Sequence, residues 1–238
     1  MKTNLDRQIK NQIDSEQISP MLSHTCLSKL DVSSLSLEQQ LRTDIKAKAS
    51  RGEYTIAIAL LNRLIALCPD NAAHYNNRGL MYFYNHQITE AFDDLSEALE
   101  IDPNLDSAYN NRANCHAAKG DLAEAIIDYD LALDLNPANI RAWINQGITL
   151  RELGMYDLAL ENFDIALIIS DSLPARIYAE RGRTYYLHGD WNCAVADYRT
   201  ALEILAGQSN KVALECKVKD WLDRLLHSTA IAENFDFT

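Results

Sequence analysis

The sequence predicts an all-α protein built from a repeating pair of antiparallel helices. Three prolines, Pro69, Pro103 and Pro137, stand 34 residues apart. Each is followed by a similar segment, which reads AAHYNNRG from 72, DSAYNNRA from 106 and NIRAWINQG from 139. A fixed period of this length is typical of proteins in which one supersecondary unit stacks on the next. We therefore expect a solenoid.

Five positions in each 34-residue copy carry the same kind of side chain, counted from Ala72, Asp106 and Ile140. The fourth is aromatic, the eighth is small, the twentieth and twenty-seventh are alanine, and the twenty-fourth is large and apolar. These are Tyr75, Tyr109 and Trp143; Gly79, Ala113 and Gly147; Ala91, Ala125 and Ala159; Ala98, Ala132 and Ala166; Leu95, Tyr129 and Phe163. Small residues let two helices approach closely, and large ones fill the space between layers. The pattern resembles the tetratricopeptide repeat, a helix-turn-helix unit of this length, which implies a right-handed α-solenoid.

The frame divides the chain into a tail, an array and a cap. Residues 1–37 hold seven serines and no aromatic residue, so we expect a polar tail that is partly disordered or forms a short helix. The array covers 38–206, with repeats at 38–71, which is degenerate, 72–105, 106–139, 140–174 and 175–206. An apolar stripe at helical spacing predicts a capping helix at 207–228, and 229–238 is expected to be loose. The stripe is Leu214, Val218, Trp221, Leu222 and Leu225.

Comparison of the copies predicts a contact inside each repeat. The seventh position reads Arg78, Arg112, Gln146 and Arg181, and the twenty-third reads Asp94, Asp128, Asn162 and Asp197. Where arginine becomes glutamine, aspartate becomes asparagine. We expect the two positions to meet, as an ion pair in three copies and an amide pair in the third, because losing one charge alone would strand the other.

Composition and motifs argue against several classes of function. A net charge of -12 and a pI near 4.9 argue against a nucleic-acid partner, which needs concentrated Lys and Arg. No secretory signal is visible, and the most apolar stretch, 56–68, is too short to span a bilayer, so we expect a cytoplasmic protein without membrane insertion. Five cysteines without paired spacing are interpreted as reduced thiols. The sequence shows no phosphate loop, nucleophile elbow or metal motif, so we predict no catalytic residue, no metal and no cofactor.

The resemblance implies that the first helix of each repeat lines a concave groove. Asparagine offers a donor and an acceptor to an extended peptide backbone, and arginine suits an acidic or carboxylate-terminated segment. The candidate groove residues are Asn77, Asn110, Asn111, Asn114, Asn145, Arg141, Arg151, Arg176, Arg183, Phe83, Tyr84 and Tyr186. Only Glu152 and Glu180 oppose the four arginines. Two alternatives stay open: the asparagines are solvated without a partner, and the N-terminal tail covers the groove.

These features predict a non-enzymatic scaffold or adaptor that holds an extended, acidic segment of a partner protein in its groove. One alternative is an assembly or regulatory factor of an enzyme or membrane complex, acting through the tail or the convex face. A minor alternative is a co-chaperone that binds a chaperone C-terminus. Asn114, Asn145 and Arg176 fall on three of the five clamp sites that this would need, but Asn110 and Glu180 occupy the other two. Homo-oligomerisation is left open.

Overall fold

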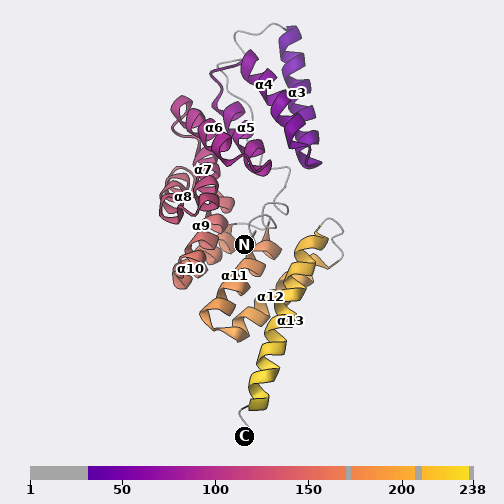
Figure 1. Cartoon of the computed structure of the whole chain (residues 1–238), viewed down its shortest axis with the longest axis vertical. Coiled ribbons are helices and arrows are strands. Elements are labelled where there is room, and N and C mark those ends of the chain that lie inside the picture. The colour runs from indigo at the N-terminus through magenta and orange to yellow at the C-terminus, as the bar shows by residue number, and fades with distance from the viewer. Residues whose placement is uncertain (1–31, 170–172, 207–210, 236–238) are drawn as a thin grey trace. The chain divides into compact units, whose positions relative to one another are not determined.

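The computed structural model describes residues 32–169, 173–206 and 211–235, and it describes side chains between 37 and 227 (Figure 1). All regular structure in these residues is helical, as predicted. The helices are α3 (Val32–Ser50), α4 (Tyr54–Leu67), α5 (Ala72–Tyr84), α6 (Ile88–Ile101), α7 (Asp106–Lys119), α8 (Leu122–Leu135), α9 (Ile140–Glu152), α10 (Tyr156–Ile169), α11 (Pro174–His188), α12 (Trp191–Leu205) and α13 (Val212–Phe235). None of the described helices combines the length and apolar character that a membrane span requires.

The described residues form two compact units, which divide between Asn139 and Ile140. In the first unit α3 to α8 follow one another so that each helix packs against the next. In the second unit α9 to α13 do the same, and α13 lies against both α12 and α11. Each unit is therefore a stack of helix pairs, which confirms the predicted fold class.

The helices begin where the repeat frame predicts. Ala72, Asp106 and Ile140, the first residues of the three best copies, are the first residues of α5, α7 and α9. The fourth copy begins one residue earlier than predicted, because Pro174 occupies the first turn of α11. A proline suits that place, since its missing N–H would have no helical partner there and its φ is already helical.

The positions predicted to be small lie where two helices touch. A Cβ atom added to Gly79 would stand 2.8 Å from Cγ of Leu95, and one added to Gly147 would stand 3.0 Å from two ring carbons of Phe163. The recurring alanines of the second helix are fully buried. Any larger side chain at these positions would push the two helices of a pair apart.

Two helix boundaries differ from the prediction. α3 begins at Val32, inside the segment 1–37 that was interpreted as a tail; residues 1–31 lie outside the described part of the chain. α13 continues to Phe235, so the expectation of a loose end from 229 was wrong for 229–235. No glycine or proline occurs between 212 and 235 to end that helix.

Candidate functional site

The structure brings the seventh and twenty-third positions into contact in all four repeats. Two parallel N–H···O bonds join each arginine to its aspartate, with N···O distances between 2.6 and 2.8 Å. These pairs are Arg78 with Asp94, Arg112 with Asp128 and Arg181 with Asp197. In the third repeat Nδ2 of Asn162 donates to Oε1 of Gln146 over 2.8 Å. The arginines are therefore engaged inside their own repeats.

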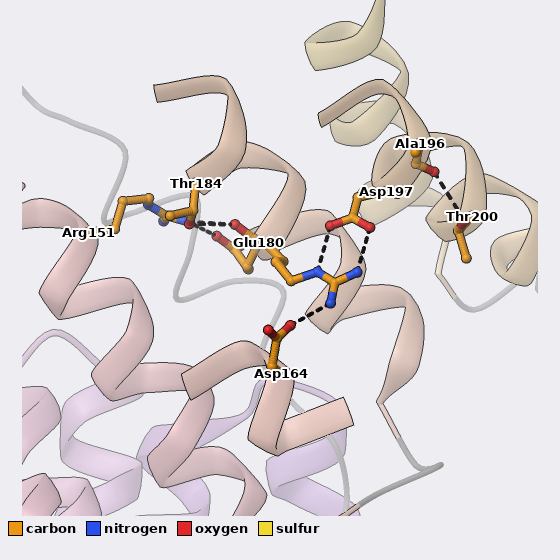
Figure 2. A network of polar contacts seen from close by, with 8 residues as sticks. Arg151, Asp164, Glu180, Thr184, Ala196, Asp197 and Thr200 are labelled. Atoms are coloured by element: carbon orange, nitrogen blue, oxygen red, sulfur yellow. Dashed lines mark hydrogen bonds and ion pairs between the residues drawn. The ribbon is translucent and has the colours of Figure 1, made fainter. Parts of the chain in front are cut away.

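Two of these arginines also reach the preceding helix pair. Nη1 of Arg78 donates to Oδ1 of Asn62 at 2.7 Å, and Nη1 of Arg181 donates to Oδ1 of Asp164 at 2.6 Å. Figure 2 labels Asp164 and Asp197, the two aspartates to which the guanidinium of Arg181 donates. The hydrogen bond that each guanidinium donates to its aspartate is the main influence that raises the pKa of Arg78 and of Arg181. Each side chain links two neighbouring repeats.

The predicted asparagine column is largely buried. Asn77, Asn110, Asn111 and Asn145 are each at most 8% exposed. In the first unit Nδ2 of Asn111 donates to Oδ1 of Asn76 at 2.9 Å, and Nδ2 of Asn110 donates to Oδ1 of Asn111 at 3.2 Å. The bond between Asn111 and Asn76 ties α7 to α5, a role that the sequence interpretation missed.

The other predicted side chains of the first unit also make internal contacts. Asn114 accepts a hydrogen bond of 2.7 Å from the hydroxyl of Tyr129. Phe83 and Tyr84 are buried in the core of the unit, and the ring of Tyr84 stacks on that of Tyr54 with 5.5 Å between centroids. We therefore do not carry Phe83 and Tyr84 forward as ligand anchors.

In the second unit the predicted Arg151 lies in a buried ion pair. It is 4% exposed, and its Nη1 donates to Oε2 of Glu180 at 2.9 Å and to the Glu180 carbonyl oxygen at 3.1 Å. Figure 2 shows Arg151 beside Glu180 and Thr184, whose Oγ1 is 3.5 Å from the same nitrogen. Burial alone would raise the pKa of Glu180, but the surrounding cations, Arg151 first, outweigh it and hold the pKa at about 2.

Three further cations surround this pair, and together they form what we call the Glu180 cluster: Arg151, Arg176, Arg183, Lys217 and Glu180. Nη2 of Arg176 donates to Oδ1 of Asn145 at 3.3 Å, and Nζ of Lys217 is 3.9 Å from Oε1 of Glu180. Lys217 was missed from the sequence because it lies on α13, outside the repeat frame. Its spacing of four residues from Trp221 on a helix was the signal that could have found it.

The remaining predicted residues, Arg141 and Tyr186, lie on α9 and α11, the helices that carry Arg151 and Glu180. Arg141 is on α9 and partly exposed, and Tyr186 is on α11 and 40% exposed. The predicted groove positions of α9 and α11 therefore hold four arginines, Arg141, Arg151, Arg176 and Arg183, against two carboxylates, Glu152 and Glu180.

One buried cluster in the first unit resembles a metal site in composition. Ligand atoms of Glu38, Cys68 and His74 all lie within 4.8 Å of one another. Cys68 is disulfide-bonded, however, so the interpretation of every cysteine as a reduced thiol was wrong for this residue. A disulfide sulfur is not the thiolate that binds metals. Glu38 is already paired with Arg42, and this cluster carries no metal proposal.

Comparison with known proteins agrees with the helix pairs. Residues 72–105 and 107–139 match the family model described as Tetratricopeptide repeat, and residues 46–85 match one described as TPR repeat. Tetratricopeptide repeat protein 36 of Caenorhabditis elegans is 31% identical over 110 residues, which cover 42% of this chain. The chain spans 59% of the length of that relative.

Solved structures extend the likeness of fold to most of the chain. The crystal structure of TTC0263, a thermophilic TPR protein in Thermus thermophilus, is 20% identical with a TM-score of 0.67, covering 79% of this chain and 98% of that one. The crystal structure of YrrB, described as a TPR protein with an unusual peptide-binding site, is 20% identical with a TM-score of 0.54 and covers 79% and 98%. The repeat frame, the stacked helix pairs and the family models together show that residues 46–139 are built from tetratricopeptide repeats, and the solved structures show the same fold over most of the chain.

Proposed function

We propose that this protein is a non-enzymatic interaction scaffold that holds an extended, acidic segment of a partner protein against α9 and α11 of the second unit. The observation that carries the proposal is the local reversal of charge. The whole chain has a net charge of -12, yet the predicted groove positions of these two helices hold four arginines, Arg141, Arg151, Arg176 and Arg183, against only Glu152 and Glu180. A positive patch on an acidic protein attracts and orients an acidic ligand.

Polar groups beside these cations fit a peptide backbone. Oδ1 of Asn145 accepts a hydrogen bond from Arg176, which places an amide next to a guanidinium on adjacent first helices. An amide offers a donor and an acceptor, and a guanidinium offers several donors in one plane. Peptide binding by YrrB, as its description states, supports the idea that stacked helix pairs of this kind can hold a peptide.

Charge reversal tests the proposal. The full chain is used to capture partners from its native cell, and the captured proteins are identified by mass spectrometry. We expect the Arg141→Glu and Arg176→Glu double variant to lose its partners, because each substitution replaces attraction by repulsion at the acidic segment. The matched control is Arg199→Glu on α12, an exposed arginine whose reversal changes the net charge without touching α9 or α11. Unchanged capture by the double variant would contradict the proposal.

A second candidate function is supported by an exposed apolar stripe on α8. Ile127, Leu131 and Leu135 are 60%, 39% and 41% exposed and lie at i, i+4 and i+8 on one side of the helix. Such a stripe suits docking of another apolar surface, as an assembly factor acting away from the first helices would need. Capture that survives the arginine reversals but is lost in Ile127→Glu would favour this second function.

A further inference from the structure

The helix α13 brings a cation and an aromatic ring next to Arg183. The guanidinium carbon of Arg183 is 5.1 Å from the ring centroid of Trp221, and Nζ of Lys217 is 4.6 Å from the same centroid. Two cations from two helices therefore meet at one indole ring. The ring attracts both through its negative face, which holds together two like charges that otherwise repel.

Arg183 uses none of its hydrogen-bond donors within the described part of the chain. The other arginines of the cluster donate to protein oxygens, Arg151 to Glu180 and Arg176 to Asn145. Arg183 contacts the ring of Trp221 and makes no hydrogen bond or ion pair with any described residue. A guanidinium has five N–H donors in a planar fork. The guanidinium of Arg183 is partly buried, and its N–H donors are available to an acceptor on a bound ligand.

The charges of the cluster are also unbalanced. Four cations, Arg151, Arg176, Arg183 and Lys217, influence the carboxylate of Glu180, and two of them, Arg151 and Arg183, also influence that of Glu152. Glu180 is 4% exposed and is already bonded to Arg151. Burial lowers the pKa of Arg183 and of Lys217, and the charge of Arg151 lowers both further. Both side chains therefore carry a desolvation and repulsion cost that an added anion would relieve.

We propose that Arg183 and Lys217, held by Trp221, form a carboxylate-binding site between α11 and α13, and that it takes an acidic side chain of the bound segment. This inference rests on the proposed function and extends the binding surface from the repeats to the capping helix. The planar fork of Arg183 matches the two oxygens of a carboxylate, and Lys217 adds a second charge. The ring of Trp221 contacts both cations and holds their side chains in place.

The test uses the indole N–H signal of Trp221 in the full chain. The protein has three tryptophans, so the signal is assigned in the ¹H–¹⁵N spectrum by its loss in Trp221→Phe. The probe is an oligoglutamate peptide with both ends capped, which carries side-chain carboxylates only. A capped oligoglutamine peptide is the neutral control. We expect oligoglutamate to shift the Trp221 signal and oligoglutamine to leave it in place.

Substitutions assign the effect to the site. We expect Arg183→Gln and Lys217→Gln each to weaken oligoglutamate binding by about tenfold or more, because each removes a charge-assisted contact. The matched control is Lys219→Gln on the same helix, whose side chain is 57% exposed and paired with Glu215; it should bind as the wild type does. A thermal melt of each variant shows that α13 is still folded onto the unit.

The probes distinguish a side-chain carboxylate from a terminal one. The variants distinguish failure of the Arg183 and Lys217 site from failure of the proposed function. A shift caused only by a neutral peptide with a free C-terminus would keep the site but assign it to a terminal carboxylate. An equal shift with inorganic phosphate at matched ionic strength would overturn carboxylate recognition. If oligoglutamate binds Arg183→Gln and Lys217→Gln as it binds the wild type but not the Arg141→Glu and Arg176→Glu variant, the site is refuted and the proposed function stands. If neither oligoglutamate nor the peptide with a free C-terminus binds the wild type, both fail.

Discussion

The contact between Arg112 and Asp128 predicts a strong coupling between two substitutions. Arg112→Gln and Asp128→Asn are made singly and together in the full chain. The double variant reproduces in the second good copy the pair that the third copy already carries, Gln146 with Asn162. The chain therefore supplies its own design for the double substitution, and only the single variants leave a charge without its partner.

The magnitude follows from burial and hydrogen bonding. The pair is joined by two charge-assisted bonds of 2.7 Å, with 23% of the Arg112 side chain and 5% of the Asp128 side chain exposed. Removing one partner of a buried pair costs about 3 to 5 kcal/mol. We expect about 3 kcal/mol for Arg112→Gln, which strands the more buried carboxylate, and about 2 kcal/mol for Asp128→Asn, because the guanidinium reaches water. The double variant should lose about 1 to 2 kcal/mol, so the coupling is about 3 kcal/mol.

The assay is urea unfolding followed by far-ultraviolet circular dichroism, with the four proteins compared at a common slope. A matched control is the same cycle at the exposed pair of Lys219 and Glu215 on α13, where water and salt screen the charges and no coupling is expected. Additive single effects at Arg112 and Asp128, or a double variant less stable than either single one, would refute the reasoning.

Three further predictions concern stability. Gly147→Ala should lower the free energy of unfolding by about 1 to 3 kcal/mol, measured by urea unfolding, because its Cβ would stand 3.0 Å from Phe163. His74, with a pKa lowered by burial and then by a nearby arginine to about 4 from 6.5, stays neutral in the fold while the unfolded chain binds a proton. Stability should therefore fall by about 3 kcal/mol between pH 6.5 and 4, and His74→Leu should abolish this loss in unfolding measured across that range. Glu180→Gln leaves Arg151 buried without a counter-charge, so the melting temperature should drop, and adding Arg151→Met should restore most of it.

Much of the fold could be predicted because small and large side chains recur at the positions where the helices of each repeat pack together. Alanines of the second helix are fully buried, and Gly79 meets Leu95 at a distance that admits no larger residue. The copies also act as an alignment of the chain with itself. The joint change at Gln146 and Asn162 predicted a side-chain contact that no single copy could have indicated.

The site was harder to predict because the repeat frame places each residue on a helix face but does not show which side chains it contacts. Arg151 occupies a groove position, but Glu180 on the next first helix draws it into a buried pair. Position alone could not show this, since it depends on the spacing between two repeats. Lys217 and Trp221 belong to α13, where no second copy exists for comparison. The disulfide at Cys68 was likewise invisible, because cysteine spacing alone does not define a pairing.

Site-specific photo-crosslinking tests the central claim most directly. A photoreactive phenylalanine analogue replaces Tyr186 on α11, which is 40% exposed, and in separate proteins replaces Trp191 on α12 or Ile127 on α8, which are 49% and 60% exposed. The protein is irradiated with its captured partner, and the attached segment is sequenced by mass spectrometry. We predict attachment at the Tyr186 position, to a segment rich in aspartate and glutamate. Attachment only at the Trp191 or Ile127 position, or to a segment without acidic residues, would contradict the account.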